Sequence, residues 1–345
     1  MTPPSKRRLQ PIAPSADWRV DLAEGCSAHR SYCYLVGSLK GPPITRVYAN
    51  LEEILAGLPA YLGQGSVTSR SRARSHEGTT FEASCYTDPL ALEPLTGSLS
   101  AAIAWFGRWN ADAQLHFTTK FADVAALLPL DHGGRTRMRA SINPRAFARF
   151  EGGTAPVAAR LSALRRMADA GYPVGLTIAP IIAAEGWETA YGELIEQAGI
   201  ALDGVIDLDL TVELITHRFN PGSKAVLESW YPGSDLDMTG QNRATKRTKL
   251  GPRSRFMTRT PCAACGPSLK PGSPNAYRQR GSSTGHDGLF HVRHPLRGPS
   301  HNQPLEASFR EHCRDGRSPH TALERGRLAS GRGLAPRTST SSTSG

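Results

Sequence analysis

The feature that most restricts the fold is a regular alternation of strand-like and helix-like segments along residues 18–230. Extended apolar patterns that predict strands lie at residues 18–23, 79–84, 114–120, 136–142, 172–182 and 206–215. Patterns with helical spacing follow them, at residues 51–61, 95–106, 121–128, 155–170, 187–202 and 224–230. Repeated strand–helix units predict a parallel sheet, because each helix returns the chain to the end where the next strand begins. We therefore predict an α/β fold, a partial (β/α)6 TIM-like barrel. A doubly wound sheet competes, but no Gly-rich phosphate loop follows the first strand.

The positive charge of the chain is concentrated beyond residue 251. Residues 252–345 contain 15 Lys and Arg against 5 Asp and Glu, within a chain whose net charge is +11. This segment is rich in Arg, Pro, Ser and Gly, and its few large apolar side chains cannot offset the entropy cost of folding. We predict a short linker or remnant over residues 1–16, a barrel domain over 17–251 and a disordered basic tail over 252–345.

The sequence also restricts where the protein works. The chain has no run of 18 apolar residues, so we predict no membrane span. Its first residues are basic and Pro-rich without an apolar segment, so we expect no secretory signal. The expected location is the cytoplasm, where thiols stay reduced and six Cys residues indicate metal binding or catalysis before disulfides.

Reactive side chains gather at the ends of the predicted strands. Cys26 follows the first strand, Cys85 follows the second, Lys120 ends the third and Ser141 lies near the end of the fourth. Because active sites of such barrels lie at the C-terminal ends of the strands, we expect these side chains to face one cavity. Taken singly, each also fits a structural role: a buried Cys is common in protein cores, and a Lys at a strand end is often solvated.

The most specific pattern covers residues 23–35, which read AEGCSAHRSYCYL. It resembles the loop after the first barrel strand of radical S-adenosylmethionine enzymes, where Cys-x3-Cys-x2-Cys holds an iron–sulfur cluster. Further matches follow in family order at residues 81–85 (FEASC), 117–121 (FTTKF), 139–143 (RASIN) and 213–219 (ELITHRF). On these motifs, residues 17–251 resemble the spore photoproduct lyase family.

The resemblance implies a DNA repair reaction. In this family a [4Fe–4S] cluster and S-adenosylmethionine supply a radical that returns the thymine dimer called spore photoproduct to two thymines. The partners implied are DNA containing thymine dimers, which must be extruded from the duplex, and an electron donor of the flavodoxin or ferredoxin type. We expect a monomer without membrane contact.

The resemblance also assigns roles to individual side chains by motif position. They comprise catalytic residues (Cys85, Tyr32 and Tyr34), residues that bind S-adenosylmethionine (Thr87, Lys120 and Ser141) and cluster ligands (Cys26 and Cys33).

Arg30 stands where the family pattern has its middle cluster cysteine. Cys26 precedes it and Cys33 follows it at the expected spacing. A guanidinium is a permanent cation that offers no thiolate to iron, and the adjacent His29, the alternative ligand, is one residue out of register. We predict that Arg30 points into or beside the cluster space and that repair activity is impaired.

The second departure from the family pattern is the tail. Relatives continue beyond the position of Gly251 into a further strand and helix, so we expect one side of the barrel to be open here. A reading-frame shift would give the observed composition. The alternative function is a non-catalytic nucleic-acid-binding protein whose basic tail contacts DNA phosphates.

Overall fold

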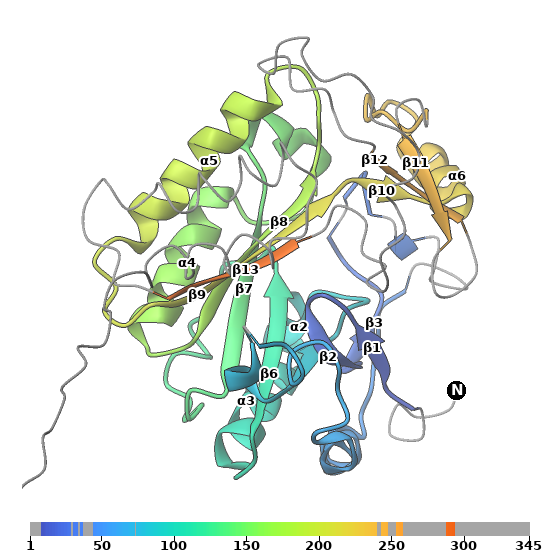
Figure 1. Ribbon diagram of the computed structural model, residues 1–345. Coiled ribbons are helices and arrows are strands. Elements are labelled where there is room, and N and C mark those ends of the chain that lie inside the picture. Colours follow the sequence, from blue (N-terminus) through green and yellow to red (C-terminus); the bar gives the residue numbers. More distant parts are fainter. Residues whose placement is uncertain are drawn as a thin grey trace, which may run out of the picture.

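A computed structural model of the chain describes residues 8–28, 30–33, 35–36, 44–72, 74–239, 243–247, 253–257 and 288–293. Its main feature is a sheet of eight strands in the order β1-β2-β5-β6-β7-β8-β9-β13 (Figure 1). Six of these strands are parallel: β2 (Ala16–Val20), β5 (Thr79–Ala83), β6 (Ala113–Thr119), β7 (Thr136–Ile142), β8 (Val174–Ile181) and β9 (Asp209–Thr216). At the two edges, β1 (Gln10–Ile12) and β13 (Gly288–Arg293) run antiparallel to their neighbours. The sheet curves without closing, which confirms the predicted partial (β/α)6 barrel.

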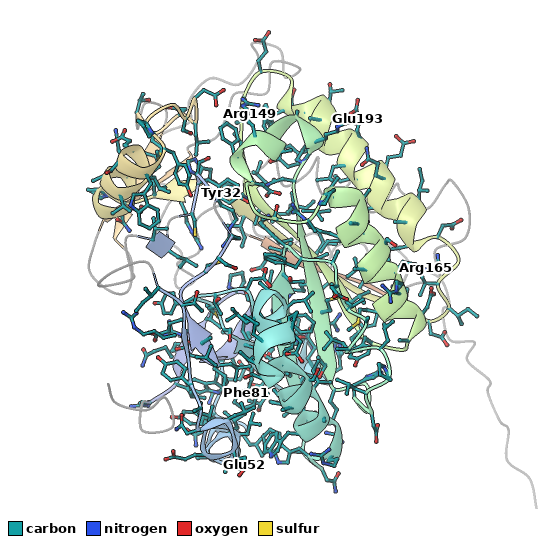
Figure 2. The ribbon with its side chains drawn as sticks, turned by 180° about the vertical axis from the view of Figure 1, so that it is seen from behind. Tyr32, Glu52, Phe81, Arg149, Arg165 and Glu193 are labelled. Atoms are coloured by element: carbon teal, nitrogen blue, oxygen red, sulfur yellow. The ribbon has the colours of Figure 1, made fainter. Side chains whose placement is uncertain are left out.

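Helices cover the outer face of this sheet (Figures 1 and 2). They are α1 (Leu51–Ala56), α2 (Pro89–Thr96), α3 (Ser98–Arg108), α4 (Val157–Asp169) and α5 (Trp187–Leu202), with 3-10 turns at Leu58–Tyr61, Ser75–Glu77 and Arg145–Phe150. A further helix, α6 (Pro221–Trp230), lies apart from this face (Figure 1). The helix predicted at residues 95–106 is two helices, because Gly97 has a φ of 61°, a left-handed conformation that ends α2. The helix predicted at residues 121–128 is wrong. The Asp123 carboxylate accepts a hydrogen bond from the Ala125 amide there and stabilises a turn instead.

The C-terminal ends of the parallel strands lie close to the predicted ones. Five of the six end within one residue of the predicted position. The first strand differs, because β2 ends at Val20 and the chain then forms a separate two-stranded ribbon of β3 (Ala23–Glu24) and β4 (Arg46–Val47). The loop that contains Cys26 and Arg30 begins directly after β3.

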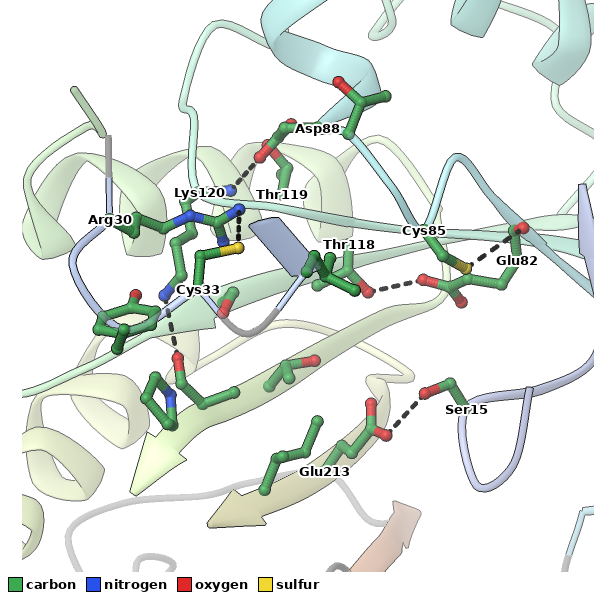
Figure 3. A pocket seen from close by; sticks show the side chains of 18 of the residues that line it. Ser15, Arg30, Cys33, Glu82, Cys85, Asp88, Thr118, Thr119, Lys120 and Glu213 are labelled. Carbon is green, nitrogen blue, oxygen red and sulfur yellow. Dashed lines mark hydrogen bonds between the residues drawn. The ribbon is translucent and has the colours of Figure 1, made fainter. Parts of the chain in front are cut away.

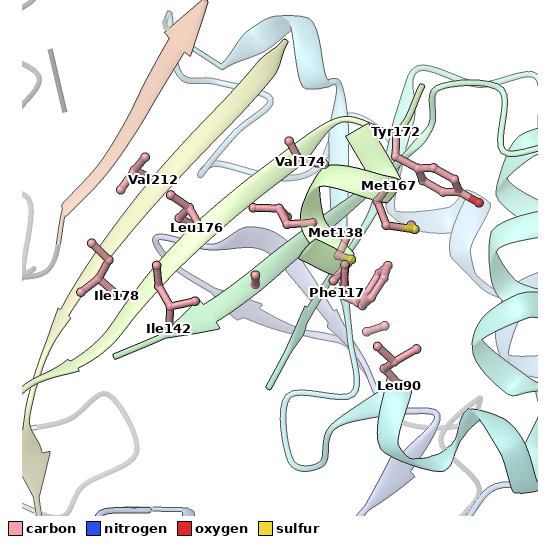
Figure 4. Packing of buried hydrophobic residues seen from close by; sticks show 14 of the residues in the cluster. Leu90, Phe117, Met138, Ile142, Met167, Tyr172, Val174, Leu176, Ile178 and Val212 are labelled. Carbon is pink, nitrogen blue, oxygen red and sulfur yellow. The ribbon is translucent and has the colours of Figure 1, made fainter. Parts of the chain in front are cut away.

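Alternation along β7 separates an apolar layer from a polar one. Successive side chains of a strand point to opposite faces, so Met138 and Ile142 join the apolar cluster between the sheet and the helices (Figure 4). Arg137 and Arg139 point to the inner face, yet both are at most 1% exposed. At β7 the inner face of the half-barrel is therefore buried and polar, whereas the outer face is buried and apolar.

Buried charges on the inner face are paired. The Arg139 guanidinium donates hydrogen bonds to the carboxylates of Glu82 and Glu213, the latter at 3.1 Å. Gly175 on β8 leaves room for it, because a Cβ at that position would lie 2.7 Å from the Arg139 Cγ. Arg137 in turn contacts Asp209 at 3.0 Å. Such pairing is what allows charged groups to lie inside a protein.

Two strands fall within the predicted disordered tail. β12 (Arg253–Met257) pairs with β11 (Arg243–Arg247) and with β10 (Arg218–Phe219), and β13 pairs along β9 from Asp209 to Leu214. The prediction of a tail without strands is wrong for these two segments, and the rest of residues 258–345 lies outside the described residues. The predicted open side at β9 is also wrong, because a sheet edge offers hydrogen-bonding groups that a β-prone segment can satisfy.

None of the helices in the described ranges is long and apolar enough to span a membrane.

Candidate functional site

A cavity opens at the C-terminal ends of the parallel strands (Figure 3). Six of the side chains singled out from the sequence line it: Tyr32, Cys33, Cys85, Thr87, Lys120 and Ser141. Cys26 does not line the cavity, but its sulfur contacts Arg30, which does. Tyr34 and His29 lie outside the described residues. The expectation of one shared cavity is confirmed for Cys33, Cys85, Lys120 and Ser141 and is wrong for Cys26, which does not line it. The chemical roles of these side chains remain predictions.

The guanidinium of Arg30 lies between two thiols. Its Nη2 is 3.4 Å from the Cys26 Sγ and 3.9 Å from the Cys33 Sγ. Burial raises the pKa of Cys26, against the nearby Arg30 charge that lowers it, so this sulfur is a neutral thiol at pH 7. As expected, Arg30 points toward the two predicted cluster ligands, because its Nη2 lies close to both sulfurs.

This arrangement does not fit a [4Fe–4S] cluster. The cluster needs thiolate ligands. The loop has two cysteine sulfurs here, and the Arg30 cation lies close to both of them. Among the residues that the structure describes, no group of three or more His, Cys, Asp or Glu side chains is arranged to hold a metal ion. We therefore derive no chemical step through such a cluster for this chain.

A turn after β5 brings Cys85 to the cavity. Ser84 adopts a φ of 54°, and its carbonyl accepts a hydrogen bond from the Thr87 amide at 3.0 Å, which closes a turn at the strand end. The Cys85 Sγ lies 4.0 Å from the carbonyl oxygen of Glu82. Burial raises the pKa of this thiol well above its usual value, and the negative charge of Glu82 adds to the effect. Cys85 therefore keeps its hydrogen at neutral pH.

Glu151 gathers four donors beside the cavity. Its Oε1 accepts hydrogen bonds from the Tyr32 hydroxyl, from the Lys120 Nζ at 2.7 Å and from the Asn143 Nδ2 at 3.0 Å. Its Oε2 accepts from the Arg160 Nη2 at 2.6 Å. One carboxylate thus ties the loop after the first strand to the ends of β6 and β7 and to α4.

The charges in this cluster shift one another's pKa values. Burial opposes ionisation of Glu151, but the cations of Lys120 and Arg160 outweigh it and lower the pKa of Glu151 to about 2. Burial lowers the pKa of Lys120 to about 8, even though Glu151 favours its charged form. Burial and the Glu151 charge together raise the pKa of Tyr32 well above its usual value, so its hydroxyl remains protonated.

Sequence reasoning missed Glu151 and Asp88. Glu151 lies just after a 3-10 turn, outside any strand or helix, and no pattern in the sequence indicates its partners. Asp88 caps α2 and accepts hydrogen bonds from the Thr119 hydroxyl at 2.7 Å and from the Lys120 amide at 2.8 Å. An Asp followed by Pro89 is a recognisable helix start, so this residue could have been found.

The fold and the cavity together define a half-barrel α/β protein whose site lies at the C-terminal strand ends, which is where enzymes of barrel folds bind their substrates. A sequence model described as spore photoproduct lyase matches residues 6–261. The spore photoproduct lyase of Geobacillus sp. (strain Y412MC61) is 41% identical over 239 residues, which are 69% of this chain and 67% of the relative. The spore photoproduct lyase of Bacillus subtilis (strain 168) is 39% identical over 239 residues, again 69% of this chain and 67% of the relative.

Solved structures agree with the sequence comparisons. A spore photoproduct lyase complexed with dinucleoside spore photoproduct superposes with a TM-score of 0.66 at 39% identity, covering 72% of this chain and 71% of that one. A variant of spore photoproduct lyase with bound AdoMet and dinucleoside spore photoproduct gives the same TM-score at 38% identity and the same coverage. The chain belongs to the spore photoproduct lyase family.

Proposed function

We propose that the cavity is the binding site for S-adenosylmethionine and for a thymine-dimer lesion in DNA, as in radical S-adenosylmethionine repair. Support comes from the related structures that hold AdoMet and dinucleoside spore photoproduct, and from the cavity that Thr87, Lys120 and Ser141 line here. The protonated thiol of Cys85 suits its proposed role as the donor of the final hydrogen atom.

We further propose that this chain is impaired in repair. The observation that carries the proposal is the Arg30 guanidinium within 3.4 Å and 3.9 Å of the Cys26 and Cys33 sulfurs. Iron–sulfur chemistry would supply the one-electron reduction of the sulfonium in this family, and the two thiols present are too few to hold a full cluster.

Iron and sulfide content per chain after anaerobic reconstitution tests the impairment. The unmodified protein is expected to bind substoichiometric, oxygen-sensitive iron and not to cleave S-adenosylmethionine above background. Arg30→Cys should raise iron loading toward about four per chain, with an absorbance near ~400 nm. Arg149→Cys is the matched control, because it adds the same thiol at an exposed position and should leave loading low.

A reading of about four irons in the unmodified protein would mean that another ligand completes the cluster and that the chain is not impaired. DNA binding discriminates the alternative function. If removal of residues 258–345 abolishes salt-sensitive DNA retention while Arg30→Cys leaves it unchanged, the basic tail is the binding element and the non-catalytic function is favoured.

A further inference from the structure

Arg30 brings a cation to the cavity wall without a direct ion pair to a described carboxylate. Its side chain contacts the Cys26 and Cys33 sulfurs, which are weak acceptors, and its Nε is shielded from solvent with no hydrogen-bond partner. No carboxylate of the described residues lies within ion-pair distance of this guanidinium. A shielded donor of a charged group costs free energy unless something accepts from it.

The other arginines in the interior have carboxylate partners. Four arginines are buried among the described residues, and each forms an ion pair with a carboxylate: Arg74 with Glu77, Arg137 with Asp209, Arg139 with Glu82 and Glu213, and Arg160 with Glu151. Arg30 therefore differs from these buried arginines, because its charge has no carboxylate partner within ion-pair distance among the described residues.

Neighbouring carboxylates are already engaged. The Asp88 carboxylate accepts from the backbone amides of Ala91 and Lys120 and from the Thr119 hydroxyl. Glu151 is held by its four donors, two of them cations. Asp88 keeps its charge, because its donors are neutral, and that charge favours the charged form of Arg30 from a distance. Arg30 still has no direct carboxylate partner among the described residues, and an anionic ligand would supply one.

We propose that Arg30 binds the carboxylate of the methionine moiety of S-adenosylmethionine, so that this chain holds the molecule without a cluster. The inference rests on the proposed function, in that the cavity must accept S-adenosylmethionine. A guanidinium matches a carboxylate with two parallel hydrogen bonds, the strongest arrangement available to a side chain at such a site.

The layout of the cavity suits this orientation. Arg30 lies beside Lys120 and Cys33, while Cys85 and Glu82 lie well apart from it across the cavity (Figure 3). A ligand anchored at Arg30 by its carboxylate would extend its remaining atoms over the strand ends toward Cys85. The cation thus fixes one end of the ligand and leaves the thiol side for the lesion.

Binding to iron-free protein tests the inference, with two probes that differ at the amino-acid end. S-adenosylhomocysteine carries the carboxylate, whereas 5′-methylthioadenosine has the same adenosine and thioether without it. By calorimetry we expect the first to bind about 10–100-fold more tightly, as a charged bidentate contact allows. In Arg30→Gln this preference should fall to about threefold or less, with binding of 5′-methylthioadenosine unchanged.

Two further variants serve as controls for charge and for folding. Arg30→Lys retains the charge but not the fork, so it should give an intermediate preference and guards against a folding defect in Arg30→Gln. Arg149→Gln removes an exposed arginine, which is paired with Asp235 at 2.8 Å on the surface, and should keep the full preference. Thermal unfolding of each variant checks that it is folded.

Each outcome has a defined meaning. If neither probe binds, the proposed S-adenosylmethionine site is wrong and the inference falls with it. If both probes bind equally to the unmodified protein, the site stands and the role of Arg30 is overturned. A preference that persists in Arg30→Gln but disappears in Arg218→Gln would assign the carboxylate to the other arginine that lines the cavity. Stronger competition by inorganic phosphate than by methionine would make this a phosphate site and overturn the carboxylate assignment.

Discussion

Replacing Glu151 by Gln tests whether one carboxylate holds the cavity together. The substitution keeps the shape of the side chain but leaves the cations of Lys120 and Arg160 without their buried negative partner. Removing one member of a buried ion pair typically costs about 3–5 kcal/mol, because the other charge stays buried and uncompensated. We expect a loss of this size in the free energy of unfolding at pH 7.

The pKa of Glu151 gives an independent magnitude. A folded-state pKa of about 2 against an ordinary value of 4.5 corresponds to about 3 kcal/mol, at 1.36 kcal/mol per unit. Because the folded-state pKa is depressed, this stability is fully present above about pH 4.5 and is lost as the pH falls toward about 2. More than half of it should be gone at about pH 3.

Urea unfolding followed by tryptophan fluorescence measures both effects. The gap between the unmodified protein and Glu151→Gln should be about 3 kcal/mol at pH 7 and should shrink by more than half at pH 3. Glu193→Gln is the matched control, since Glu193 is exposed on α5 and points away from the sheet (Figure 2). A gap below about 1 kcal/mol at pH 7, or one that is equal at both pH values, would refute the role given to Glu151.

Three further outcomes are expected. Gly175→Ala should lower the free energy of unfolding by about 1–3 kcal/mol, because its Cβ would lie 2.5 Å from a threonine hydroxyl on β9. Gly192→Ala on α5, where no atom lies within 4 Å of the added Cβ, should instead raise this free energy by about 0.5–1 kcal/mol. Asp17→Asn should cost about 2 kcal/mol at pH 7, read by urea unfolding, since its buried carboxylate accepts hydrogen bonds from several backbone amides. Alkylation of Cys85 by iodoacetamide at pH 7.5 should be at least ~10-fold slower than that of a free cysteine and should recover in urea, as peptide mass spectrometry would show.

The strand ends could be predicted from the sequence because they depend on local patterns. Runs of apolar residues and their limits placed Cys85, Lys120 and Ser141 at the C-terminal rim, and the parallel arrangement then required a shared cavity. Alternation along β7 likewise predicts two faces. It does not say that the face with Arg137 and Arg139 is buried as well, because that depends on partners elsewhere in the chain.

Long-range pairing explains what the sequence could not indicate. Arg139 is neutralised by Glu82 and Glu213, which are 57 and 74 residues away along the chain. Glu151 finds Tyr32 at a separation of 119 residues. No local pattern records such pairs, since each depends on how separate strand–helix units come together. The split at Gly97 is different, because a glycine within a predicted helix is itself a local signal of a break.

The antiparallel pairing of β13 with β9 determines which backbone groups lie at this edge of the sheet. Without β13, the backbone amides and carbonyls of β9 between Asp209 and Leu214 would form an unpaired edge, to which a strand from another molecule could add. The sequence of β13, GLFHVR, contains a Gly and an Arg, residues that discourage further strands from joining. A chain shortened to end at β12 would expose the β9 edge to strands from other molecules. The six residues of β13, which lie beyond the region matched by the family model, therefore limit how far the chain can be shortened without exposing that edge.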